Sequence, residues 1–362
     1  MSTARPTLTV VALLIAAGLL AAGCGSKSSS GSTTTVTTTA AGASATGGGT
    51  SKVLVGAGST FVFPLVSQWT ADYSKKAGVT VTYGAIGSGG GIASVTDRSV
   101  DFGASDAPLT TDQVKSCNGC VELPWALGGT SIPYNVTGAP AHLHLSGPVL
   151  ADIYLDKIKS WNDPAIAKLN PGVNLPATKI TPVFRSDASG TSYNFTDYLA
   201  SISSTAKSKI GVTTQPAFPT GVGAKGSSGV AGVLAKTNGS IGYVDVAYAQ
   251  QSNLAYAAMQ NAAKQFVLPD VSSVGAAAAV APSPKPNSAV SIVNPPASAK
   301  HAYPIATFTY VIVPKTSSKG ATMRAFLNYA VTSGQALGPK LLFTPLPPRV
   351  VSANKVAIAG IH

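Results

Sequence analysis

Residues 52–61 read Lys-Val-Leu-Val-Gly-Ala-Gly-Ser-Thr-Phe. The apolar run Val53–Val55 ends in a glycine turn, and apolar residues then recur at helical spacing at Phe63, Val66 and Trp69. A short apolar run predicts a strand, and the later spacing predicts a helix. This strand-turn-helix unit decides the fold class because the chain repeats it.

The repetition continues through the rest of the chain. We expect strands at 79–83, 100–103, 180–184, 241–246 and 308–313, and helices near 153–158 and 193–199. Such alternation is typical of an α/β architecture with mainly parallel sheets flanked by helices. Residues 269–300 are rich in Ala, Ser and Pro with weak patterning, so we expect an irregular insertion there.

Length and composition narrow the protein class. The 362 residues suggest about two domains. Apolar residues make up 45% and charged residues 10%, which is enough for a core and excludes a disordered polyampholyte. The 37 Gly and 25 Pro favour tight turns over long helical bundles. Only four His and three Cys are present, and they form no metal-ligand pattern, so we expect no metal centre.

The N-terminal segment has the pattern of an export signal. Arg5 precedes an apolar run, Leu8–Ala22, that is too short for a comfortable membrane span. We therefore expect residues 1–23 to be a signal peptide. Small residues before Cys24 resemble a bacterial lipoprotein cleavage box, although the Leu stands one position earlier than that pattern prefers. We expect a lipid on Cys24; the alternative is ordinary cleavage that leaves a free thiol.

The following segment, 24–52, consists almost entirely of Gly, Ser, Thr and Ala after the cysteine. It cannot bury a core and is expected to act as a flexible tether. The formal net charge of +12 is compatible with nucleic acid, anionic lipid or a small anion as partner. An exported chain without a Lys/Arg-rich run makes nucleic acid the least expected of these.

Three predicted strand-to-helix turns are rich in glycine and hydroxyl groups: 58–61, 87–91 and 185–191. Helix N-termini offer free N–H groups and a positive dipole end, where anions bind. Glycine permits close approach, and Ser and Thr donate hydrogen bonds without adding charge. Arg185 supplies a planar fork for an oxyanion. Each turn alone fits simple helix capping, but together they indicate an oxyanion site.

These motifs carry a specific resemblance. The segments Gly56–Phe61, Ile86–Gly91, Val100–Leu109, Arg185–Ser192 and Ile241–Val244 resemble the PstS family, the phosphate-binding proteins of bacterial ABC phosphate importers. The resemblance implies a two-lobed, type II periplasmic-binding-protein fold with one phosphate in the cleft. It also implies a monomeric, lipid-anchored, extracytoplasmic receptor that delivers phosphate to the membrane subunits of a permease, without a cofactor and without enzymatic activity.

The resemblance also implies a division into lobes and a set of ligands. One lobe would comprise 53–131 plus 300–362, and the other 132–299. Residue by residue, the phosphate ligands would be Thr60, Phe61, Ser88, Asp106, Arg185, Ser189, Gly190 and Thr191, with Asp187 orienting Arg185.

Asp106 needs a separate physical argument. A carboxylate facing an anion is repulsive unless a proton is shared between them. Phosphate near neutral pH keeps a proton to donate, whereas sulfate does not, so Asp106 would select phosphate over sulfate. The alternative for Asp106 is a turn-forming residue before Ala-Pro.

The remaining sequence motifs do not indicate a catalytic or metal site. Cys117 and Cys120 form a C-x-x-C motif in a polar turn, and an exported chain favours a small structural disulfide over zinc or redox chemistry. Ser189 lies outside a Gly-x-Ser-x-Gly motif, and no His is placed near it by any motif. A secreted phosphatase, or a receptor for another oxyanion such as sulfate, remains as an alternative function.

Overall fold

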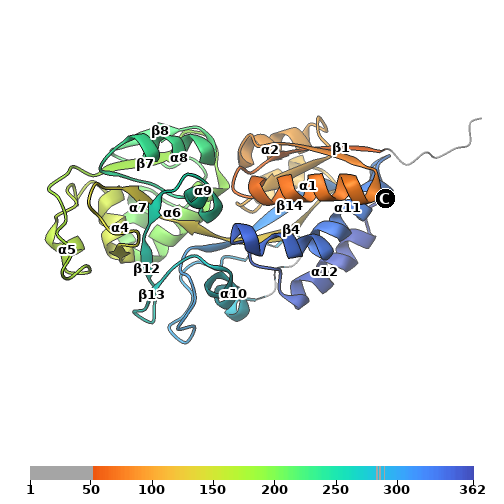
Figure 1. Cartoon of the computed structure of the whole chain (residues 1–362). Helices are drawn as coiled ribbons and strands as arrows, with labels where there is room; N and C mark the ends of the chain where they lie inside the picture. The colour runs from red at the N-terminus through yellow and green to blue at the C-terminus, as the bar shows by residue number, and fades with distance from the viewer. Residues whose placement is uncertain (1–51, 283, 285–286, 289) are drawn as a thin grey trace, which may run out of the picture. The chain divides into compact units, whose positions relative to one another are not determined.

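The computed structural model describes residues 52–282, 284, 287–288 and 290–362. The predicted signal peptide 1–23, the Gly/Ser/Thr-rich tether up to Ser51 and Cys24 lie outside the described residues. Two mixed sheets, each flanked by helices, build the folded part of the chain (Figure 1).

The larger sheet has six strands in the order β10-β4-β14-β3-β1-β2. Its strands are β1 (Val53–Gly58), β2 (Thr80–Gly84), β3 (Phe102–Ser105), β4 (Cys120–Ser131), β10 (Val244–Asp245) and β14 (Ala306–Pro314). Strand β1 runs parallel to β2 and β3, with Val53 opposite Thr80 and Gly56 opposite Phe102. The other three pairs of neighbouring strands, β3 with β14, β14 with β4 and β4 with β10, are antiparallel.

The second sheet has five strands in the order β11-β5-β9-β7-β8. These are β5 (Pro133–Asn135), β7 (Thr181–Arg185), β8 (Val222–Ala224), β9 (Ser240–Ile241) and β11 (Ala255–Tyr256). Strand β7 pairs parallel with β8 and β9. A small third sheet joins β6 (His144–Leu145), β12 (Ala258–Gln260) and β13 (Phe266–Val267).

Helices cover the sheets of both lobes. They are α1 (Phe63–Ala77), α2 (Ser88–Thr96), α3 (Thr111–Ser116), α4 (Gly147–Tyr154), α5 (Pro164–Ala167), α6 (Gly190–Ile202), α7 (Ser204–Lys209), α8 (Gly226–Lys236), α9 (Val246–Gln251), α10 (Val271–Val280), α11 (Gly320–Val331) and α12 (Pro348–Ala359). Two 3₁₀ turns, Ser333–Leu337 and Pro339–Leu341, lie between α11 and α12. Figure 1 shows β7, β8 and α8 in one lobe and β1, α1 and α2 in the other.

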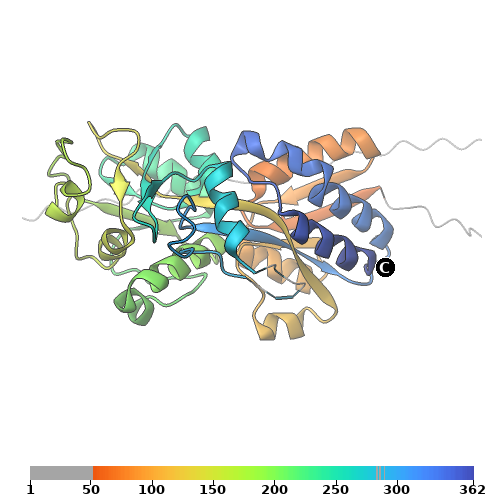
Figure 2. The same ribbon diagram turned by 90° about the horizontal axis from the view of Figure 1, so that it is seen from below.

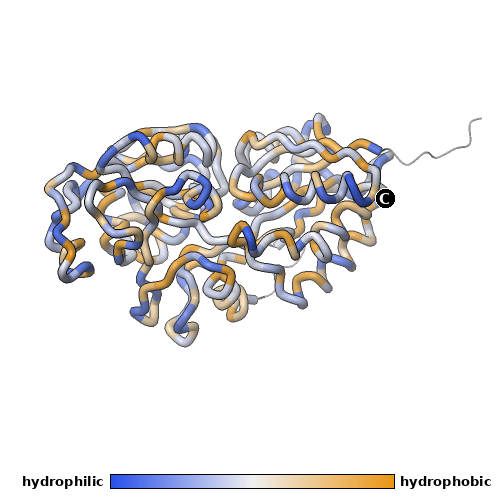
Figure 3. The backbone as a smooth tube through the Cα atoms, in the orientation of Figure 1, coloured by the Kyte–Doolittle hydropathy of each residue, from blue (hydrophilic) through white to orange (hydrophobic). Residues whose placement is uncertain are grey.

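Helix α1 illustrates how the sequence specifies these elements. Pro64 stands in its first turn, where a missing N–H costs nothing, and Gly78 ends the helix in the left-handed region at φ 63°. Trp69 on its inner face is fully buried, and its indole N–H donates to the carbonyl of Gly334 at 2.8 Å. Apolar and polar residues alternate along the helices that cover the sheets (Figure 3), as expected for faces that bury one side.

The predicted two-lobed α/β class is confirmed, but the expectation of mainly parallel sheets is wrong. The long strands β4 and β14 lie side by side and antiparallel, with Ala306 opposite Gly129 (Figure 2). Because one runs out of the first lobe and the other returns to it, they cannot share a direction. They make the larger sheet mixed, and the second sheet is mixed because β5 pairs antiparallel with β9 and β11.

Two element predictions also need correction. The predicted strand 241–246 divides at Gly242 and Tyr243 into β9 and β10, which belong to different sheets. Part of the predicted irregular insertion forms helix α10, which starts at a capping box made by Asp270 and Ser273. An Ala-rich helix gives almost no apolar periodicity, which explains why the pattern was not visible.

Candidate anion-binding site

Four helices begin at the junction between the lobes. Helices α1 and α2 follow β1 and β2, whereas α6 and α8 follow β7 and β8, so each begins beyond the carboxyl end of a parallel strand. No residue before α1 or α2 caps the helix with its side chain, whereas Asp187 and Thr60 accept the N–H groups of Gly226 and Ser227 at the start of α8. The positive dipole ends of these helices favour an anion at this place.

The turn after β1 meets the turn after β3 through Ser59. Its hydroxyl donates to Oδ1 of Asp106 at 2.5 Å and accepts the backbone N–H of Phe61 at 3.0 Å. Ser59 is fully buried, and Asp106 is 2% exposed. One carboxylate oxygen of Asp106 is therefore fixed by the protein.

Ser88 connects the lobes at the start of α2. Its hydroxyl oxygen accepts the backbone N–H of Gly190 at 3.0 Å and that of Asp106 at 3.3 Å. A Cβ on Gly190 would lie 2.6 Å from the Asp106 nitrogen, so only glycine permits this approach. Because the Ser88 oxygen accepts from protein donors, its own proton remains available for another acceptor.

Arg185 is the buried cation of the site. Its side chain is 1% exposed and forms a two-bond pair with Asp187, at 2.8 Å from Nε and 2.5 Å from Nη2. Its Nη1 reaches Oγ1 of Thr191 at 3.5 Å. Burial alone would raise the pKa of Asp187, but Arg185 and the Gly226 N–H together hold that pKa below its usual value. Asp187 thus stays ionised and fixes the guanidinium plane.

The electrostatics of Asp106 differ from those of Asp187. Burial raises the pKa of Asp106 to about 7, against the opposing effects of Ser59, Arg185 and Thr191. A carboxyl group with such a pKa exchanges a proton near neutrality. It is therefore suited to share a proton with a ligand that carries one.

The structure brings the sequence-predicted residues into one cluster. Hydrogen bonds or direct backbone approach link Phe61, Ser88, Asp106, Arg185, Asp187, Gly190 and Thr191. Ser189 caps α6 beside Gly190 by accepting the N–H of Ser192 at 3.2 Å. Thr60 adjoins Phe61, and its hydroxyl contacts the hydroxyl of Ser227 at 2.8 Å.

The two cysteines lie elsewhere. Cys117 and Cys120 are joined in a disulfide with a Cα–Cα distance of 5.5 Å, between α3 and β4. Arg98, just beyond α2, donates to the carbonyls of Cys117 and Asn118 at 3.0 Å. The pair makes no contact with the anion cluster in the described part of the chain.

Three residues of this region are not among the ligands expected from the sequence: Ser59, Ser227 and Tyr248. Ser59 stands directly before Thr60, and Ser227 lies in a fourth Gly-Ser turn, Lys225–Ser228, that the same criterion could have found. Tyr248 donates its hydroxyl to the Thr60 carbonyl at 2.8 Å. No local pattern predicts this contact, because its partner is 188 positions away.

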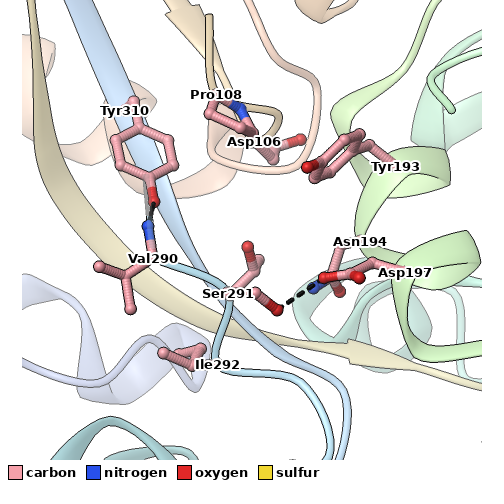
Figure 4. A pocket seen from close by; sticks show the side chains of 10 residues that line it. Asp106, Pro108, Tyr193, Asn194, Asp197, Val290, Ser291, Ile292 and Tyr310 are labelled. Atoms are coloured by element: carbon pink, nitrogen blue, oxygen red, sulfur yellow. Dashed lines mark hydrogen bonds between the residues drawn. The ribbon is translucent and has the colours of Figure 1, made fainter. Parts of the chain in front are cut away.

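Two cavities border the cluster. One, of about 30 Å³, lies between Asp106 and the side chains of Tyr193 and Asp197 on α6, and Ser291 donates to Asp197 at 2.6 Å (Figure 4). The other has a volume of about 320 Å³ and opens between the lobes. It is lined by Thr60, Phe63, Ala85, Ile86, Asp187, Lys225, Gly226, Ser228 and Tyr248.

Comparison with known proteins places the chain in a family. Residues 28–333 match the PBP superfamily domain. The chain is 42% identical over 300 residues to the phosphate-binding protein PstS of Xylella fastidiosa strain Temecula1. The aligned region covers 82% of each sequence. It is 39% identical over 307 residues to that of Pasteurella multocida, covering 83% of this chain and 88% of the relative. The chain belongs to the PstS family.

Solved structures support the fold of this PstS-family chain. A high-affinity periplasmic phosphate-binding protein, PfluDING, superposes with a TM-score of 0.70 at 22% identity and covers 84% of this chain and 93% of its own. A putative phosphate ABC transporter substrate-binding protein from Clostridium perfringens gives 0.60 at 17% identity, with 82% and 100% covered. These likenesses establish the two-lobed fold.

Family membership also decides the broad biochemical class. The PstS relatives are named as binding proteins, and this chain is a solute-binding protein rather than an enzyme. Within the described residues, no three His, Cys, Asp or Glu side chains are grouped so as to hold a metal ion. No helix in that same part of the chain is both long and apolar enough to span a bilayer.

Proposed function

We propose that this chain captures inorganic phosphate in the anion cluster and delivers it to the membrane subunits of an ABC importer. The observation that carries the proposal is the combination of uncapped helix N-termini, the buried cation Arg185 and a single carboxyl group, Asp106, whose pKa is raised to about 7. Hydrogen-bond donors surround the site, and the Asp106 carboxyl group in it can accept a proton from the ligand.

Each residue of the cluster has a role in this proposal. Thr60 donates its hydroxyl and N–H, and Phe61 donates its N–H, which it shares between the ion and the Ser59 hydroxyl. Ser88 donates its free hydroxyl proton, and Arg185 pairs with the phosphate charge while Asp187 orients it. Ser189, Gly190 and Thr191 form the cradle at the N-terminus of α6, and Asp106 accepts a hydrogen bond from the phosphate proton.

Calorimetric titration of the purified chain, freed of bound anion, tests the assignment. Tight one-to-one binding of phosphate with little response to sulfate is the expected result. Equal binding of phosphate and sulfate would show that Asp106 does not select between the two ions. Binding of neither ion by demonstrably folded protein would contradict the ligand assignment itself.

The proposed setting is the outer face of the cell membrane. Cleavage after residue 23 and a lipid on Cys24 would tether a monomer there, with residues 24–52 between the lipid and the folded lobes. Replacing Cys24 with Ala should move the protein from the membrane fraction to the soluble extracytoplasmic fraction. An unchanged distribution between these fractions would contradict lipid anchoring.

To capture phosphate by closing over it, the protein needs two lobes that move as units and a hinge between them. We place the lobes at 53–131 plus 300–362 and at 132–299. The pairing supports this division, because five of the six strands of the larger sheet come from the first set and the five-stranded sheet comes wholly from the second. Strand β10 is the exception, and it pairs with Thr130 and Ser131 beside the proposed hinge.

A further inference from the structure

Thr60 forms hydrogen bonds with two residues of the opposite lobe, Ser227 and Tyr248. The backbone N–H of Ser227, at the start of α8, donates to Oγ1 of Thr60 at 3.2 Å, and the two hydroxyl oxygens lie 2.8 Å apart. The hydroxyl of Tyr248, on α9, donates to the Thr60 carbonyl at 2.8 Å. All three residues are buried, at 5%, 0% and 8% exposed for Thr60, Ser227 and Tyr248.

These contacts also determine what the Thr60 hydroxyl can do. A threonine hydroxyl has one proton and two lone pairs. The Ser227 N–H occupies one lone pair, and the Ser227 hydroxyl occupies the second when it acts as donor. The proton of Thr60 is then left for an acceptor other than Ser227. The phosphate of the proposed function is such an acceptor.

The larger cavity shows where these bonds lie relative to the solvent. Its wall includes both Thr60 and Tyr248, and it opens between the lobes. Helices α8 and α9 lie in one lobe and α1 in the other (Figure 1). The bonds to Thr60 therefore join the lobes between the anion cluster and this opening.

We propose that Ser227 and Tyr248 form a latch on Thr60 that holds the lobes closed and sets the rate of phosphate release. The inference rests on the proposed function, because it assigns two further positioning residues to the same site. Neither residue needs to touch the ion. Ser227 orients the Thr60 hydroxyl as a donor, and Tyr248 fixes the Thr60 backbone against the opposite lobe.

The test compares Tyr248→Phe and Ser227→Ala with two matched controls. Ser228→Ala removes a neighbouring hydroxyl in the same cavity, and Tyr256→Phe removes a tyrosine hydroxyl elsewhere in the same lobe. Release is followed by loading the purified chain with radiolabelled phosphate and chasing with excess unlabelled phosphate. Titration gives the affinities for phosphate and sulfate, and thermal unfolding verifies that each variant is folded.

Each latch variant should release phosphate about five- to tenfold faster than the unmodified chain, as expected for one lost hydrogen bond. Association rates and the ratio of phosphate to sulfate affinity should stay unchanged, because Asp106 is untouched. Both controls should match the unmodified chain. If one variant fails to fold, the other still decides the question.

Release rates equal to those of the unmodified chain in folded latch variants would overturn the latch. An equal acceleration in the controls would overturn it as well. Failure of the unmodified chain to bind phosphate would instead contradict the proposed function, so the two failures are distinguishable.

Discussion

At the scale of single residues, Asp106 shows how burial turns an ordinary turn residue into a selective acceptor. Ser59 occupies its Oδ1, and burial raises its pKa to about 7. An acceptor buried without a partner costs about 1–3 kcal/mol, and more when it is charged. Sulfate brings no proton to this buried carboxyl group, whereas a protonated phosphate can donate one to it.

The variant Asp106→Asn tests this acceptor. The amide cannot repel sulfate and can donate a hydrogen bond to it, so the ratio of phosphate to sulfate affinity should fall about tenfold or more. Calorimetric titration with each ion measures the ratio. An unchanged ratio would remove Asp106 from the selection mechanism.

Glu122 on β4 provides a prediction about pH. Its side chain is 2% exposed and accepts the N–H of Leu109 at 3.0 Å, and burial raises its pKa from 4.5 to about 7. The folded chain therefore binds the proton more tightly than the unfolded chain. The stability that Glu122 contributes is present below pH 4.5 and is lost as the pH rises to about 7.

The variant Glu122→Gln keeps an acceptor for Leu109 but cannot ionise. It should be more stable than the unmodified chain at pH 8 by about 1–3 kcal/mol and equal to it near pH 4. Thermal unfolding of the ligand-free proteins across this range measures the difference. Phosphate affinity should not change, since Glu122 lies outside the cluster. A stability difference that is the same at every pH would contradict the prediction.

At the scale of elements, the N-terminus of α6 must fit against the turn after β3. A Cβ on Gly190 would lie 2.6 Å from the nitrogen of Asp106 and 2.7 Å from that of Ala107, both rigid backbone atoms. Gly190→Ala should therefore force the two turns apart. Overpacking costs of about 1–3 kcal/mol would weaken phosphate binding by roughly five- to hundredfold.

Gly232→Ala is the matched control for this substitution. Gly232 lies within α8, and a Cβ there would meet nothing within 4 Å. The alanine should stabilise the helix by about 0.5–1 kcal/mol and leave phosphate affinity unchanged. Titration and thermal unfolding of both variants provide the comparison. Normal affinity in folded Gly190→Ala would show that the close approach is not needed for binding.

The elements also show what a sequence can reveal. Strand-turn-helix units such as 53–77 are local, so their periodicity predicted the α/β class and the turns that hold Ser88 and Arg185. The antiparallel pairing of β4 with β14 and the contact of Tyr248 with Thr60 join distant segments, and no local pattern encodes them. Helix α10 was missed because alanine fits any face of a helix.

At the scale of the whole molecule, charge connects the chain to its proposed ligand. The formal net charge is +12, and a positive protein attracts a small anion before contact. Lys225 stands at the wall of the cavity that opens between the lobes and makes no ion pair among the described residues. Its ammonium group is therefore free to guide an approaching phosphate ion.

Lys225→Gln should slow phosphate association about two- to threefold at low ionic strength and leave the release rate unchanged, because Lys225 is not bonded to Thr60. The effect should vanish at about 0.5 M salt, where the Debye length falls to a few ångströms. Lys236→Gln is the control: it removes the same charge at the far end of α8, about 16 Å along the helix axis. Stopped-flow association rates at both ionic strengths provide the measurement. Equal slowing by both variants would indicate that net charge alone attracts the ion, and a salt-independent loss in Lys225→Gln would indicate a direct contact in place of steering.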